Sequence, residues 1–414
     1  MKTNVKIART LICLFIILVT GKVFSQNSNT TVNANKTDTS VREIQVSFLP
    51  FISFNGSPIN STVNLSLNIL GGYVKEVRTL EIGSIINIDE KNAGKCQVAG
   101  VGNVVGGVSS GFQSAGVFNF AASQMGVQIG GVLNVVARDA GKCQIAGEAN
   151  VVCGSFNGFQ AAGVINVAKS LKGVQVAGVL NTVFKDAKSS QIAGVGNVTA
   201  GSFEGCQIGG VFNYATKVTG AQISGLLNVT TFMKGTQLSF MNISDSCQGM
   251  PIGFFSFVAK GYHQLEFSAD EVFYTNIAFR TGVKHFHNIF MAGIRPGDFG
   301  SPLWTVGYGV GTIFGNSNKM SYNIDLVSQQ VNKGDFSRFD SELCKLYLGI
   351  DKKIGSKASI TAGLTYNVFI TATHAKYYND EVSTIAPYTL SNQTYSNGVN
   401  IKTWIGAKIG VRLF

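Results

Sequence analysis

Glutamine recurs along this chain every 15 or 16 residues, and this spacing constrains the fold more than any other feature of the sequence. The ten repeat glutamines are Gln97, Gln113, Gln128, Gln144, Gln160, Gln175, Gln191, Gln207, Gln222 and Gln237. In the first nine units an asparagine follows six residues later, at Asn103, Asn119, Asn134, Asn150, Asn166, Asn181, Asn197, Asn213 and Asn228. Each unit is too short to bury an apolar face alone, so the repeat predicts stacked units.

Two stacked architectures fit the alternating pattern of apolar and polar residues within a unit. In a parallel β-solenoid each unit of about 16 residues is one coil, and stacking aligns the amides into ladders. In the alternative, each unit is one strand and a turn in a single large antiparallel barrel that includes the repeats. The units also repeat in triplets of 47 residues, since Gly94–Gly100 matches Gly141–Gly147. Duplicating three antiparallel strands would invert the copy, so the sequence favours the solenoid, over residues 80–243.

Beyond residue 250 the repeat gives way to strict two-residue alternation. Ile360, Leu364 and Tyr366, for example, alternate with Thr361, Gly363 and Thr365. Runs of about ten residues with one apolar and one small or polar face are typical of membrane-spanning barrel strands. Residues 42–79 alternate in a similar way. We therefore expect an all-β protein in which strands from 42–79 and 250–414 form an antiparallel outer-membrane barrel of roughly 10–12 strands, with the solenoid inserted between them.

Two resemblances add to this interpretation. The ending Ile409-Gly410-Val411-Arg412-Leu413-Phe414 resembles the last strand of bacterial outer-membrane barrels. This resemblance implies that Phe414 acts as an insertion signal and that the barrel-insertion machinery is a partner, although Phe414 is out of phase with the apolar face. The repeat units resemble a bacterial surface-repeat family of exported proteins. That family implies a location in the cell envelope and no defined activity.

The N-terminus has the features of a cleavable secretory signal. Residues 1–25 combine the basic Lys2, Lys6 and Arg9 with an apolar run from Leu11 to Val19. Residues 26–41 are polar and are expected to form a flexible tail. The net charge of +11 falls to +7 without the four basic residues of the signal, and charged residues are only 13% of the chain. No basic stripe carries interleaved aromatic residues, so we do not expect nucleic acid as a partner. Export with a barrel predicts the outer membrane of a Gram-negative bacterium, with its lipid as a partner.

No motif for catalysis, a cofactor or a metal ion stands out. The ladder amides are poor bases, and their repetition predicts a structural role as a hydrogen-bonded spine. His285 and His287 lack a third ligand nearby, and Asp270 with Glu271 is expected to form a solvated turn. Cys96, Cys143 and Cys206 each precede a ladder glutamine, where sister units place small or apolar residues. We expect these cysteines to be unbridged and buried.

The expected function is therefore non-enzymatic. The sequence favours an outer-membrane surface protein, in which a barrel anchors a repeat scaffold or adhesin-like module that binds a ligand in the envelope or outside the cell. The alternative is a porin-type or transport barrel with the repeats lining or plugging it.

Overall fold

The computed structural model describes residues 40–296, 302–315, 320–333, 341–355, 357–372 and 385–413. The predicted signal peptide, the polar tail up to residue 39, and Phe414 lie outside the described residues. Every regular element in the described ranges is a β-strand, as the sequence predicts. None of these residues belongs to a helix long and apolar enough to cross a membrane.

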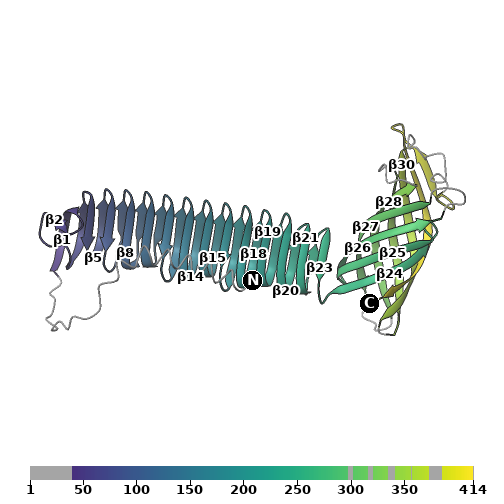
Figure 1. The fold of residues 1–414 in the computed structure, drawn as a ribbon, viewed down its shortest axis with the longest axis horizontal. Helices are drawn as coiled ribbons and strands as arrows, with labels where there is room; N and C mark the ends of the chain where they lie inside the picture. The colour runs from purple at the N-terminus through teal and green to yellow at the C-terminus, as the bar shows by residue number, and fades with distance from the viewer. Residues whose placement is uncertain are drawn as a thin grey trace. The chain divides into compact units, whose positions relative to one another are not determined.

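The first 23 strands belong to one sheet that winds into stacked coils (Figure 1). They are β1 (Ser40–Leu49), β2 (Ile52–Ser53), β3 (Ser61–Asn68), β4 (Gly71–Val74), β5 (Glu76–Gly83), β6 (Ile86–Asp89), β7 (Cys96–Ala99), β8 (Gly102–Ser109), β9 (Phe112–Ala115), β10 (Phe118–Gln124), β11 (Val127–Gly130), β12 (Leu133–Val136), β13 (Ala140–Ala146), β14 (Ala149–Ala162), β15 (Ile165–Ala177), β16 (Leu180–Val183), β17 (Ala187–Ala193), β18 (Gly196–Gly209), β19 (Phe212–Ser224), β20 (Leu227–Leu238), β21 (Met241–Cys247), β22 (Met250–Ile252) and β23 (Phe255–Val258).

Neighbouring coils pair in parallel and in register. In β14 and β15, Asn150 lies beside Asn166 and Gln160 beside Gln175. The register advances by one repeat unit from coil to coil along the stack, so equivalent residues form columns. The predicted parallel solenoid is therefore confirmed. The alternative of one large antiparallel barrel that includes the repeats is wrong, because the repeats pair with one another in parallel.

A column of glycines lies at the turn between the glutamine strand and the asparagine strand of each coil. A Cβ atom on Gly178 would lie 2.0 Å from the carbonyl oxygen of Gly163 in the preceding coil. Gly163 has the same relation to Gly147, and Gly194 to Gly178, at 2.0 and 2.1 Å. A side chain at this corner would therefore push the coils apart, which explains why the unit keeps glycine three residues after glutamine.

The solenoid is longer than the repeat alone predicts. Strand β3 pairs in parallel with β5 and β4 with β6, and β21 pairs with β23. Coils therefore extend from Ser61 to Val258, beyond the predicted limits of 80 and 243. The prediction of N-terminal barrel strands in residues 42–79 is wrong, since a solenoid strand and a barrel strand share the same two-residue alternation. The solenoid precedes the barrel in the chain and is not inserted into it.

Both ends of the stack have their backbone edges covered. At the N-terminal end β1 pairs with β2 as an antiparallel hairpin, and the carbonyls of Ser47 and Phe48 accept the amide protons of Ile69 and Leu70. At the other end Asn288 accepts from the Ser256 amide through Oδ1 and donates to the Gly253 carbonyl through Nδ2. Unpaired sheet edges invite pairing with other chains, so both contacts protect the solenoid from growing by edge addition.

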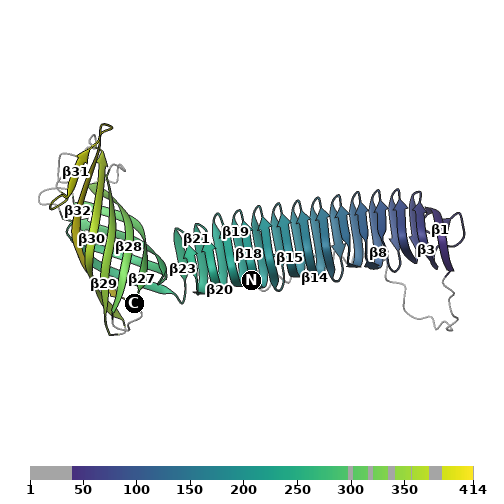
Figure 2. The same ribbon diagram turned by 180° about the vertical axis from the view of Figure 1, so that it is seen from behind.

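The remaining strands form a closed antiparallel barrel (Figure 2). They are β24 (Tyr262–Asp270), β25 (Thr275–Val283), β26 (Phe286–Arg295), β27 (Leu303–Phe314), β28 (Met320–Lys333), β29 (Ser341–Ile354), β30 (Ala358–Ala372), β31 (Ser391–Thr394) and β32 (Val399–Leu413). Pairing of β24 with β32 closes the barrel, and the short β31 flanks β32. The described barrel has eight strands around its wall, fewer than the expected 10–12, because the residues before 80 do not contribute.

The two faces of the barrel wall differ in polarity, as the alternation predicts. Leu326, Leu348 and Leu364 point outward and are 53 to 62% exposed. Asp325, Asn367 and Trp404 point inward and are fully or almost fully buried. The outer surface is therefore apolar and the interior contains polar and charged side chains.

Candidate functional sites

The predicted glutamine ladder forms inside the solenoid and is continuous. From Gln113 onward, each ladder glutamine donates an Nε2 proton to the Oε1 atom of the glutamine in the preceding coil. Gln175 donates to Gln160 at 2.8 Å, and Gln191 donates to Gln175 at 2.9 Å. The same bond recurs from Gln113 to Gln237, at 2.6 to 2.9 Å. The ladder glutamines are at most 2% exposed.

The asparagines form a second ladder in the opposite direction along the stack. Asn181 donates to Oδ1 of Asn197 in the next coil at 2.9 Å, and its second proton goes to the backbone carbonyl of Ile192 at 2.7 Å. Equivalent pairs of bonds recur from Asn103 to Asn228. The ladder amides already have partners and no access to solvent, so they are a structural spine and not a binding array.

The glutamine ladder ends at a buried pair of carboxyl groups. Glu81 takes the glutamine place in its coil, and Gln97 donates to both Glu81 at 2.7 Å and Asp89 at 2.8 Å. Burial raises the pKa of the Glu81 carboxyl. Burial and the neighbouring Glu81 together raise the pKa of Asp89 well above its usual range. The charge of this pair is therefore coupled to the stability of the N-terminal coils.

Charged residues of the solenoid gather on one wall, between each ladder asparagine and the next glutamine. A groove of about 620 Å³ runs along this wall across several coils. Its exposed polar lining includes Ser155, Asn157, Lys172, Asp186, Lys188, Glu204, Lys217 and Thr219. Lys188 and Glu204 form an exposed ion pair at 2.9 Å between adjacent coils. Apolar residues, including Phe232, line the groove between these polar groups. The groove is therefore a candidate surface for an extended ligand with both polar and apolar parts.

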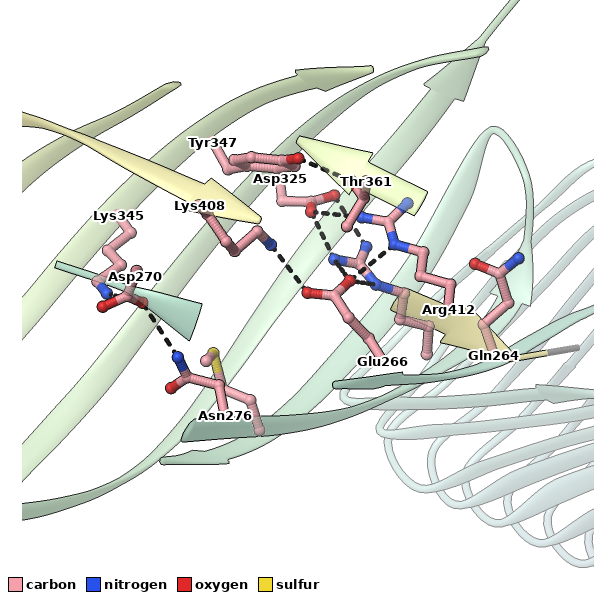
Figure 3. Close-up of polar contacts among 12 residues, drawn as sticks. Gln264, Glu266, Asp270, Asn276, Asp325, Lys345, Tyr347, Thr361, Lys408 and Arg412 are labelled. Carbon is pink, nitrogen blue, oxygen red and sulfur yellow. Dashed lines mark hydrogen bonds and ion pairs between the residues drawn. The ribbon is translucent and has the colours of Figure 1, made fainter. Parts of the chain in front are cut away.

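The interior of the barrel holds a network of buried ion pairs (Figure 3). Glu266 on β24 accepts from Arg280 at 2.8 Å, from Lys408 at 3.0 Å and from Arg412 at 2.7 Å. Arg280 also makes a two-pronged contact with Asp325, at 3.0 and 2.6 Å. These residues come from β24, β25, β28 and β32, so the network joins strands on opposite sides of the barrel through the lumen.

A turn folds into the same lumen. Asp270 accepts from the backbone amides of Val272 and Phe273 at 2.9 and 2.7 Å and from Lys345 at 2.6 Å. Glu271 accepts from the indole of Trp404 at 2.9 Å. Val272 and Phe273 are fully buried among inward residues that include Leu343 and Phe369. The prediction of a solvated turn at Asp270 and Glu271 is wrong, because partners distant in sequence surround both carboxylates.

Within the described ranges, the histidines and cysteines form no site of their own. His287 is buried beside Arg280, with Nε2 and Nη1 3.0 Å apart, whereas His285 lies exposed in the preceding turn. Cys96, Cys143 and Cys206 are free, as expected, but they face outward and are partly exposed. The expectation that these three cysteines are buried is wrong. No group of three or more metal-ligating side chains occurs in the described ranges.

Comparison with known protein families, with curated proteins and with solved structures finds no match for this chain.

Proposed function

We propose that this chain is a non-enzymatic outer-membrane surface protein in which the barrel is the anchor and the solenoid is a displayed scaffold that binds a partner or ligand. The observation that carries the proposal is the polarity of the barrel. Its interior holds buried ion pairs beside an apolar cluster, and its outer surface is apolar. A water-soluble domain instead places most of its charged side chains on the outside.

The height of the apolar band supports this assignment. On β29 the outward residues Leu346, Leu348 and Ile350 lie between the outward Glu342 and Lys352. Ten residues at about 3.3 Å each, tilted by about 40°, span roughly 25 Å, which is the thickness of the apolar band in outer-membrane barrels. The outward residues of β30 from Ile360 to Ile370 contain no charge.

A transport role receives no such support. The repeats form their own coils and do not line the barrel, so that part of the alternative prediction is wrong. Ion pairs among Glu266, Arg280 and Arg412 occupy the lumen. We expect the pure protein to give no steady conductance in planar bilayers.

The proposal is tested by expressing the full chain in a Gram-negative host. A folded membrane barrel should fractionate with the outer membrane and migrate faster on gels before boiling than after it. Recovery in the soluble fraction without detergent would contradict the anchor. Protease added to intact cells should cleave the solenoid if it is displayed, whereas cleavage only after the outer membrane is opened would contradict display.

A further inference from the structure

One continuous side of the solenoid is almost free of charge. Each coil contains a window of nine residues that begins one residue before the ladder glutamine and ends one residue after the ladder asparagine. We define the uncharged face as the outward side chains of these windows. From Cys96 to Val229, Glu148 is the only charged residue in these nine-residue windows. The lysines and acids of the same coils lie on the remaining wall. The solenoid is therefore amphipathic in cross-section.

The uncharged face is exposed and strongly apolar. Its prominent corner column consists of the residue four after each ladder glutamine, and it includes Val117, Val164, Val179, Val195, Val211 and Leu226, which are 38 to 53% exposed. A second column directly follows the ladder glutamines and includes Ile145, Ile192, Ile208 and Ile223, at 38 to 41% exposure. Because these valine and isoleucine side chains point outward, water contacts a large apolar surface. They do not contribute to the packing of the interior.

The area of this face suits a protein interface. Ten coil spacings of about 4.8 Å separate Ile85 from Phe240, so the corner column is roughly 50 Å long. One wall of the face is a strand of 4 residues, such as Cys96–Ala99, so at about 3.3 Å per residue it is about 13 Å wide and covers on the order of 650 Å². The largest apolar patch on a typical monomer is about 300–600 Å², whereas a standard protein interface uses about 800 Å² from each partner.

We propose that the uncharged face binds a second copy of this chain, face to face, to form a homodimer of solenoids. A surface without charge has no repulsion against its own copy, and homodimer interfaces are more apolar than other protein surfaces. In an antiparallel dimer, the two-fold axis can pass through a coil other than the one that contains Glu148. The Glu148 carboxylates of the two copies then do not face each other. A lipid surface fits less well, because adsorbed segments carry basic residues beside the apolar strip. The uncharged face exposes aromatic rings, including Phe112 and Phe159, but its windows contain no basic residue. Here valine dominates the corner and the lysines lie on the other wall.

The test uses the full chain in its expression host with the photo-crosslinker p-benzoylphenylalanine at Val179. A second probe replaces Val195, in case the first variant fails to fold. The control replaces Lys188, which lies on the charged wall with a side chain that is 61% exposed. After irradiation, both valine positions should give an adduct of about twice the 44.0 kDa chain mass that contains only peptides of this chain. The control should give at least tenfold less of this adduct.

Each other result would overturn the proposal. Adducts with lipid or with a different protein would identify another occupant of the face. The absence of adducts from both valine probes, in protein with the far-ultraviolet circular dichroism of the unchanged chain, would mean that the face is free. Equal yields from Lys188 would indicate non-specific association. As a check of the interface, the double change Val164→Lys and Val211→Lys should reduce the adduct from Val195 at least tenfold. The charged-wall changes Asn157→Lys and Thr219→Lys should leave it unchanged.

Discussion

The solenoid and the barrel both bury polar side chains, but they bury different kinds. The solenoid buries neutral amides, each in nearly the same surroundings as the one a coil away, such as Gln160 and Gln175. The barrel buries ions, and the Glu266 carboxylate has three cationic partners that come from two different strands. An amide donates and accepts, so a column of amides satisfies itself. A charge needs partners of the opposite sign, which must come from elsewhere in the sequence.

The largest loss of stability should follow the removal of one buried charged group from the barrel. Glu266→Gln leaves Arg280, Lys408 and Arg412 buried without their shared carboxylate. We expect a loss of about 3–5 kcal/mol in the free energy of unfolding, because breaking a buried ion pair leaves an uncompensated charge away from water. Urea unfolding in detergent, followed by the fluorescence of Trp304 and Trp404, measures this loss in the barrel alone. Glu342→Gln on the outer surface is the control, and equal midpoints for the two variants would contradict the expected cost.

Removal of one buried amide from the solenoid should lower the free energy of unfolding by a smaller amount. Gln175→Leu removes two ladder bonds and leaves a buried donor on Gln191 and a buried acceptor on Gln160. We expect about 2–4 kcal/mol, since each of the two unsatisfied groups is neutral and costs about 1–2 kcal/mol, in the lower part of the usual range. The matched variant Gln237→Leu loses one bond at the end of the ladder and should cost about half as much. Urea unfolding followed by far-ultraviolet circular dichroism compares the two variants. Equal losses in the free energy of unfolding would mean that the cost does not depend on how many ladder bonds are removed.

A carboxyl pair in the solenoid should behave differently from the ion pairs of the barrel. Among the described residues Asp89 forms no ion pair, and burial together with Glu81 raises its pKa in the folded state. The stabilising protonated form is fully present below the unfolded pKa of about 3.9 and is lost as the pH rises through the folded value. Asp89→Asn should therefore stabilise the N-terminal coils at pH 8 and have little effect at pH 4. Urea unfolding curves at both pH values test this prediction. An equal increase in the free energy of unfolding at pH 4 and pH 8 would show that the charge of Asp89 does not cause the stabilisation.

The smallest effect concerns backbone strain in one column of the solenoid. Gly173, Gly205, Gly220 and Gly235 occupy this column with φ between 131° and 136°, whereas Ser189 holds φ 106° at the same place. This region favours glycine, so Ser189→Gly should stabilise the protein by about 1 kcal/mol. The opposite change Gly205→Ala should destabilise it, because a Cβ there would meet the Ser189 carbonyl oxygen at 1.8 Å. Thermal unfolding of both variants should shift in opposite directions, and a shift of the same sign would refute this explanation.

Much of the solenoid could be predicted, because its information is local and repeated. The spacing of Gln97 and Gln113 fixes the coil length, and the spacing from Gln97 to Asn103 fixes the inward face of each coil. Residues 61–79 could not be assigned, because their coils lack the glutamine and keep only the alternation that barrel strands share. The buried turn at Asp270 and Glu271 was also beyond prediction, since its partners Lys345 and Trp404 are far away in the sequence.

By itself, the sequence determined an all-β chain with a parallel stacked repeat followed by strands with one apolar face. These properties follow from periodicity, which each segment carries on its own. The tertiary structure decided where the solenoid ends, how many strands close the barrel, and which ions meet inside it. It also decided that the uncharged side of every coil points the same way. The physical reason is that register and closure depend on contacts between residues far apart in the chain, which no local pattern encodes.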